Sequence, residues 1–94
     1  MKNPDKHLDN EKIRNRLKRI EGQIRGISNM LGEHRDCDEI ITQLSAINAA
    51  VTGTAREILY SHIRHCVAEL SKGNDAEETI EDLKRAIESF GKLK

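Results

Sequence analysis

The sequence predicts an all-α fold, a protomer of three helices built around one long central helix. Three observations predict it. Aliphatic residues recur at helical spacing through most of the 94 residues. The only proline is Pro4, so no proline interrupts the later helical patterns. The apolar residues are almost all Ile, Leu, Val and Ala, with Tyr60 and Phe90 as the only large aromatics, and this favours an aliphatic helix–helix core.

A chain of this length holds one domain. A domain so small buries little core by itself, so we expect it to oligomerise. Residues 1–8 are polar and include Pro4, and we expect a flexible N-terminal arm there. Residues 9–94 are predicted to form a single helical domain, with helices over about 9–32, 37–71 and 75–91.

The first helix is predicted over residues 9–32. Asp9 or Asn10 can cap its start, and Gly32 ends it. Between these positions aliphatic residues recur at spacings of 4, 3, 4, 3 and 4, which is typical of a helix packed along another helix. The stripe consists of Ile13, Leu17, Ile20, Ile24, Ile27 and Leu31.

The second helix is predicted to be unusually long, over residues 37–71. This stretch has no proline and one glycine, and its aliphatic residues keep helical periodicity throughout. A helix of that length needs partner helices to support it. The sequence around Gly73 breaks it, and Asn74 can cap a third helix over 75–91, with Glu77 as its capping-box partner.

Charge is distributed unevenly along the chain, although the formal net charge is zero. The segment 12–25 holds six basic residues and one acidic residue, a net charge of +5, and the acid is concentrated after residue 74. Such asymmetry within one small domain indicates a nucleic-acid surface. A solvated coiled-coil surface is the alternative. There is no helix-turn-helix spacing, zinc-finger pattern or aromatic platform, so DNA binding would rest on phosphate contacts.

Several function classes are disfavoured by the sequence. There is no apolar signal-peptide segment and no run of 18 apolar residues, so we expect a cytoplasmic protein with no membrane partner. Two cysteines in a reducing compartment are poor evidence for a disulfide. There is no glycine-rich phosphate loop or evident acid/base pair, so we do not expect an enzyme.

A candidate metal site lies on the long helix. His62 and Cys66 are four residues apart, so they project from one face and can bind one soft ion. Cys37 precedes Cys66 by 29 residues, which along a continuous helix is more than about 40 Å. If the helix is continuous, no ion can join them within one chain. Two antiparallel copies would bring Cys37 of one subunit beside His62 and Cys66 of the other.

These residues carry a resemblance to a known family. The run from Cys37 to Cys66, preceded by residues 14–26 (RNRLKRIEGQIRG), resembles the copper-sensing CsoR-type repressors of the CsoR/RcnR/FrmR superfamily. The resemblance covers about residues 9–91. It implies an antiparallel dimer that assembles into a dimer-of-dimers tetramer. It also implies an apo-protein that binds operator DNA and is released by its inducer.

Site residues follow from the resemblance position by position. Cys37, His62 and Cys66 match the metal ligands of the copper(I) branch, so the implied inducer is Cu(I). Asp82 stands where the family has a carboxylate that supports the metal-binding histidine, and Asp36 precedes the sensor cysteine. His7 is a possible extra ligand. Arg16 is the strongest implied DNA contact, followed by three further basic residues, Arg14, Lys18 and Arg19.

Other readings stay open. Residues 49–53 (AAVTG) look more like the nickel/cobalt and formaldehyde branches, so Ni(II) or Co(II) is the alternative metal. A persulfide or aldehyde sensor acting through Cys37 is a second alternative. A helical interaction or metal-buffer protein without a DNA role is a third. His34 and His65 match no ligand position, and we expect both to be solvated.

Overall fold

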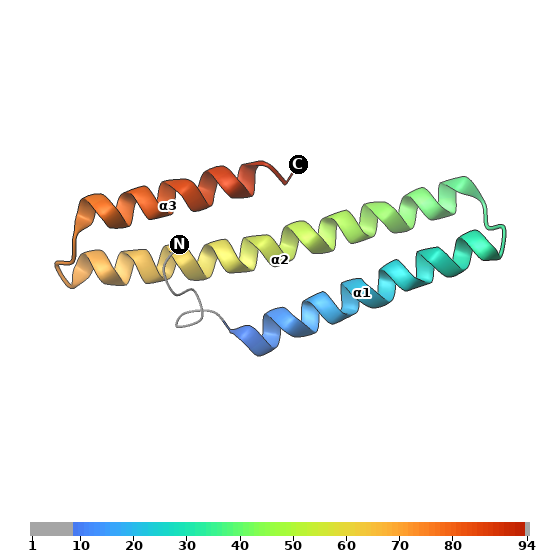
Figure 1. Cartoon of the computed structure of the whole chain (residues 1–94), viewed down its shortest axis with the longest axis horizontal. Coiled ribbons are helices and arrows are strands. Elements are labelled where there is room, and N and C mark those ends of the chain that lie inside the picture. Colours follow the sequence, from blue (N-terminus) through green and yellow to red (C-terminus); the bar gives the residue numbers. More distant parts are fainter. Residues whose placement is uncertain (1–8, 94) are drawn as a thin grey trace.

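The computed structural model describes residues 9–93, which form three helices and no strand. Helix α1 spans Asn10–Gly32, α2 spans Cys37–Ser71 and α3 spans Ala76–Gly91. Figure 1 shows α1 lying along the first half of α2 and α3 lying along its second half, and both outer helices pack against α2. The predicted all-α protomer with one long central helix is confirmed.

Aspartate side chains cap the starts of α1 and α3. Asp9 Oδ1 accepts a hydrogen bond from the Lys12 backbone N–H at 3.0 Å, as expected. The cap predicted at Asn74 is wrong, because Asp75 caps α3 and accepts from the Glu78 N–H at 3.2 Å. The Asn74 amide instead donates to the Glu69 carboxylate, so it stabilises the turn before the helix.

The heptad stripe of α1 divides into two sets. Ile20 is the most buried member, with 6% of its surface exposed, and Ile13 and Ile27, seven residues to either side, are half-buried. The alternate members Leu17, Ile24 and Leu31 are exposed, Ile24 by 51%. One half of the stripe therefore packs inside the protomer, and the other half is an apolar surface.

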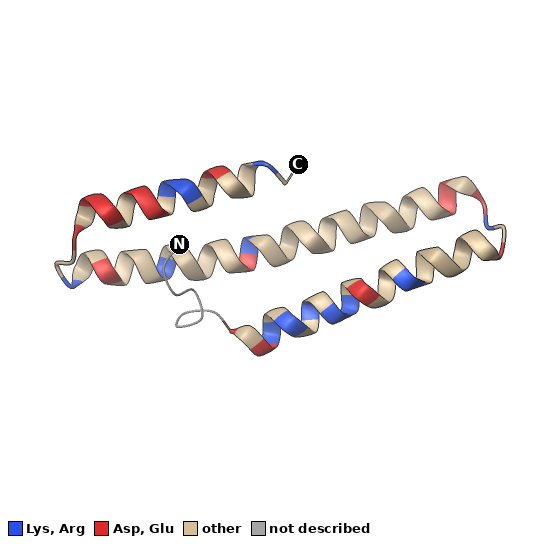
Figure 2. Ribbon diagram, viewed as in Figure 1, with Lys and Arg blue, Asp and Glu red and all other residues tan. Residues whose placement is uncertain are grey.

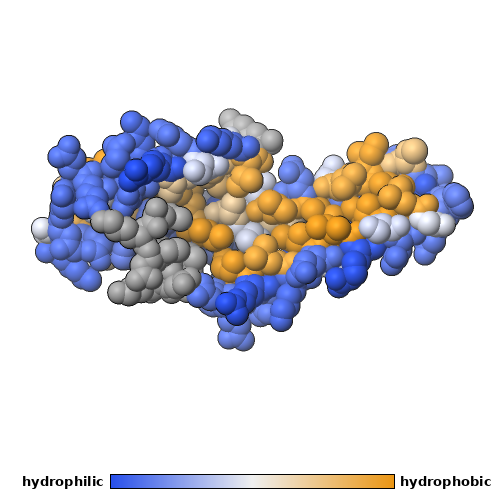
Figure 3. Space-filling view, viewed as in Figure 1, coloured by the Kyte–Doolittle hydropathy of each residue, from blue (hydrophilic) through white to orange (hydrophobic). Residues whose placement is uncertain are grey.

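The protomer is open and flat. Its radius of gyration is 17.4 Å and its extents are 59 × 24 × 14 Å, whereas a compact domain of this length has a radius of gyration of about 12 Å. Among the described residues only Ile20, Thr54, His62 and Cys66 are buried. Figure 3 shows apolar residues in a broad band along one face. Exposed apolar surface on this scale is typical of an interaction surface.

None of the helices in residues 9–93 is long and apolar enough to cross a membrane.

Candidate metal centre

His62 and Cys66 lie together where α3 covers α2. Both project from the same face of α2 one turn apart, and His62 Nε2 lies 3.7 Å from Cys66 Sγ. Only 3% of His62 and 2% of Cys66 is exposed. An imidazole nitrogen and a thiol sulfur that converge in a buried site are donors suited to a soft metal ion, so the residues present fit the predicted ligand type.

Asp82 joins this site from α3. It lines two cavities with His62, an apolar one of about 470 Å³ that reaches Phe90 and a smaller one of about 200 Å³ that includes Cys66. Its carboxylate also pairs with Arg85 at 2.6 Å. The predicted support position is therefore next to the histidine–cysteine pair.

Burial raises the pKa of the Cys66 thiol, and the negative charges of Asp82 and Glu69 raise it further. The protomer alone therefore favours the neutral thiol. A metal ion that binds this sulfur has to displace a proton.

His65 differs from the expectation of a solvated histidine. It is half-buried and lines the smaller cavity with His62 and Cys66. The two imidazole rings stack with centroids 6.5 Å apart, and His65 Nε2 lies 4.0 Å from Glu69 Oε1. Residues three apart are neighbours on a helix, and α3 covers enough of this face to include His65. His34 is exposed as expected, with a φ of 56° in the turn after α1.

Cys37 stands at the opposite end of α2. It is the first residue of the helix and is exposed, with Asp36 as the exposed residue before it. Within residues 9–93 of one chain, no three His, Cys, Asp or Glu side chains gather closely enough to hold a metal ion. The structure thus brings together two of the three predicted ligands, and His7 lies outside the described residues.

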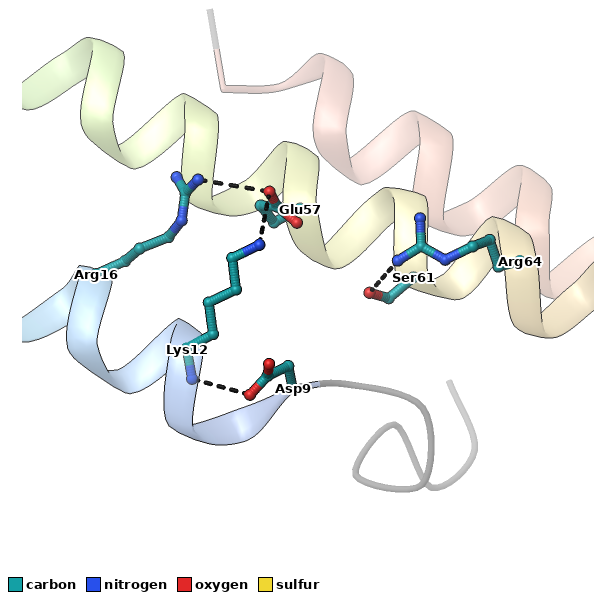
Figure 4. A network of polar contacts seen from close by, with 6 residues as sticks. All are labelled: Asp9, Lys12, Arg16, Glu57, Ser61 and Arg64. Carbon is teal, nitrogen blue, oxygen red and sulfur yellow. Dashed lines mark hydrogen bonds and ion pairs between the residues drawn. The ribbon is translucent and has the colours of Figure 1, made fainter.

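The predicted DNA contacts lie on the first half of α1, where basic residues gather (Figure 2). Arg14, Lys18 and Arg19 are exposed. Arg16 is different, because its guanidinium reaches across to α2 and lies 3.4 Å from Glu57 Oε1 (Figure 4). Lys12 Nζ lies 3.5 Å from the same oxygen.

Sequence reasoning missed the contact that Glu57 makes with this surface. Lys12 lies four residues before Arg16, which is the spacing of neighbours on one helix face. That spacing pairs the two cations, but nothing in the sequence places Glu57 between them. Glu57 lies 45 residues from Lys12 and 41 residues from Arg16 along the chain, and only the packing of α1 on α2 brings them together.

Comparisons with known proteins agree with this architecture. A family model described as "Metal-sensitive transcriptional repressor" matches residues 9–89. The copper-sensing transcriptional repressor CsoR of Bacillus subtilis is 44% identical over 84 residues, which are 89% of this chain and 83% of that protein.

Two solved structures are also similar. The nickel-responsive transcriptional regulator InrS matches with a TM-score of 0.85 and 36% identity, over 89% of this chain and 94% of InrS. The Cu(I)-bound copper-sensing repressor CsoR from Geobacillus thermodenitrificans matches with a TM-score of 0.74 and 40% identity, over 86% of this chain and 84% of that one.

Proposed function

The chain belongs to the family of metal-sensitive transcriptional repressors, and we propose that it is a repressor that senses Cu(I) at a site shared between two subunits. Transcriptional repressors are not enzymes, which agrees with the expectation from the sequence. The proposed ligands are Cys37 of one subunit and His62 and Cys66 of the other, and Asp82 holds His62 in place.

The observation that carries the proposal is the separation of the ligands. His62 and Cys66 form a buried pair at one end of α2, and Cys37 is exposed at the other end of the same unbroken helix. A second α2 packed antiparallel would bring its own Cys37 to the pair. The arrangement gives two equivalent sites in each dimer.

Cu(I) is the proposed ion because of the donor set. Two thiolates and one imidazole make a soft site of low coordination number, which suits Cu(I) better than a harder ion. The similarity to copper-sensing CsoR proteins supports this choice. Ni(II) is the second candidate, because the fold match to the nickel-responsive InrS has the higher TM-score.

DNA binding is proposed for the apo-protein. The basic first half of α1, repeated in each subunit of a dimer-of-dimers tetramer, would contact operator phosphates through Arg16, Arg14, Lys18 and Arg19. The exposed half of the α1 stripe supports an oligomer of this kind. Metal binding and DNA binding oppose each other by linkage, so each ligand lowers the affinity for the other by the same factor.

Anaerobic titration of the reduced protein with Cu(I) and with Ni(II), followed by ultraviolet absorption, tests the proposal. We expect one Cu(I) per protomer with thiolate charge-transfer bands. The Cys66→Ala and His62→Ala variants should lose tight binding, whereas the His65→Ala control should retain the stoichiometry. Tighter binding of Ni(II) than of Cu(I) would indicate that the protein is a nickel sensor. A response to aldehyde or persulfide that survives Cys66→Ala would indicate a Cys37 sensor instead.

A further inference from the structure

Glu57 occupies the position between two cations of the DNA-facing surface. The Lys12 ammonium and the Arg16 guanidinium both approach the same oxygen, Glu57 Oε1, at 3.5 and 3.4 Å (Figure 4). The two cations come from adjacent turns of α1, and the carboxylate comes from α2. We refer to Lys12 and Arg16 as the cation pair.

The geometry of the cation pair suits an anion with several oxygens. An ammonium and a guanidinium that converge on one point can hold a phosphate group between them. The Arg16 guanidinium lies close to Gly53, where an added Cβ would be 3.5 Å from Arg16 Nη1, an ordinary van der Waals contact. The Glu57 carboxylate occupies the position between the two cations that a phosphate would take.

Glu57 holds the cation pair only weakly. Both distances exceed the roughly 2.7–2.9 Å of a strong charge-assisted hydrogen bond. The side chains of Arg16 and Glu57 are 36% and 32% exposed, and that of Lys12 is more exposed still. Ion pairs in such surroundings contribute little to stability. An incoming phosphate can therefore displace the Glu57 carboxylate while the packing of α1 on α2 stays intact.

We propose that the cation pair is a DNA phosphate subsite and that Glu57 is its internal competitor. In the free protein Glu57 neutralises part of the pair's charge. On DNA a backbone phosphate replaces the Glu57 carboxylate, which returns to solvent. The proposal rests on the proposed DNA-binding function, and it makes Lys12 a further DNA contact and Glu57 a residue that limits DNA affinity.

The test is a salt titration of DNA binding by the apo-protein. The probe is a fluorescently labelled duplex selected by the wild-type protein from a random-sequence pool. Glu57→Gln keeps the shape of the side chain and removes its charge. We expect this variant to bind several-fold more tightly with nearly the same log–log salt slope, because the phosphate contact forms in both proteins and only the competing carboxylate is lost. Glu57→Asp, which keeps the charge but shortens the reach, should show a smaller gain.

Two controls separate competition from general repulsion. Glu88→Gln makes the same change of charge on an exposed residue of α3, and it should leave the affinity nearly unchanged. In a Lys12→Ala/Arg16→Ala background, the gain from Glu57→Gln should disappear, because no cation pair is left to release. Circular dichroism and molecular mass are measured for every variant to verify that it folds and assembles.

Three results would overturn the inference. The first is a DNA affinity of Glu57→Gln equal to that of Glu88→Gln. The second is a gain from Glu57→Gln that persists in the Lys12→Ala/Arg16→Ala background. The third is a loss of DNA affinity in Glu57→Gln, which would mean that Glu57 positions the cations for DNA. Selection that yields no duplex bound by the wild-type protein would overturn the proposed function itself, so the two failures are distinguishable.

Discussion

Cys37 begins α2 and Cys66 lies 29 residues further along the same unbroken helix, so a rise of about 1.5 Å per residue separates them by ~43 Å. His62 lies 3.7 Å from Cys66, and both are buried. The two cysteines can therefore serve one ion only if they come from different subunits. The length of α2 is therefore the reason why the proposed site needs a second chain.

The exposed half of the α1 stripe should be an interface between subunits. Ile24→Lys places a charge in this apolar surface and should shift the protein to a smaller assembly, because burying an unpaired charge is costly. Asn29→Lys adds the same charge at an exposed polar position of α1 and is the control. Sedimentation velocity at several protein concentrations measures the assembly. An unchanged mass for Ile24→Lys would mean that the subunits meet elsewhere.

The pKa of Cys66 should depend on Asp82. Burial is the main cause of the raised pKa and the negative charge of Asp82 is the next, so Asp82→Asn should lower the pKa without returning it to that of a free thiol. The pH dependence of alkylation by iodoacetamide, in a Cys37→Ser background, reports this value. Glu88→Gln is the control, because it removes one negative charge from the same helix.

The same pKa shift makes a prediction for stability. The folded state favours the neutral thiol, so this contribution is fully present below the unfolded pKa of about 8.5 and is lost as the pH rises through the folded-state value. Metal affinity should change in the opposite direction and rise with pH, because binding displaces the thiol proton. A Cys66 that alkylates as fast as a free thiol at neutral pH would contradict both statements.

The start of α3 offers a direct test of the capping geometry. Asp75→Ala removes the acceptor of the Glu78 N–H and should cost about 0.5–2 kcal/mol. Asn74→Ala removes only a surface contact with Glu69 and should cost less. Thermal unfolding at one fixed protein concentration compares the two variants. A larger loss of stability in Asn74→Ala than in Asp75→Ala would mean that Asn74 caps α3, as the sequence predicted.

The helices were predictable because their signals are local. Repeated aliphatic spacing, the aspartate before residue 10 and the break near Gly73 set the element bounds to within about one residue. The cap of α3 was misplaced by one residue because Asn and Asp are both good caps. The hydrogen bond from the Glu78 N–H to Asp75 and the contact between Asn74 and Glu69 distinguish them, and both depend on the folded turn.

The candidate site was predictable only in part. The spacing of His62 and Cys66 places them on one helix face, and their proximity followed from that. The partial burial of His65 and the position of Glu57 between Lys12 and Arg16 depend on how α1 and α3 pack against α2. Packing between helices distant in sequence leaves no local signal, so neither feature could be inferred from spacing.

Subunit complementation tests the shared site most directly. Cys37→Ala and Cys66→Ala proteins are prepared separately, and each alone should fail to bind Cu(I) tightly. After subunit exchange, about half of the randomly paired dimers are mixed and each has one complete site of two, so about a quarter of the wild-type capacity should return. No recovery in verified mixed dimers would contradict a site shared between subunits, and full binding by Cys37→Ala alone would remove Cys37 from it.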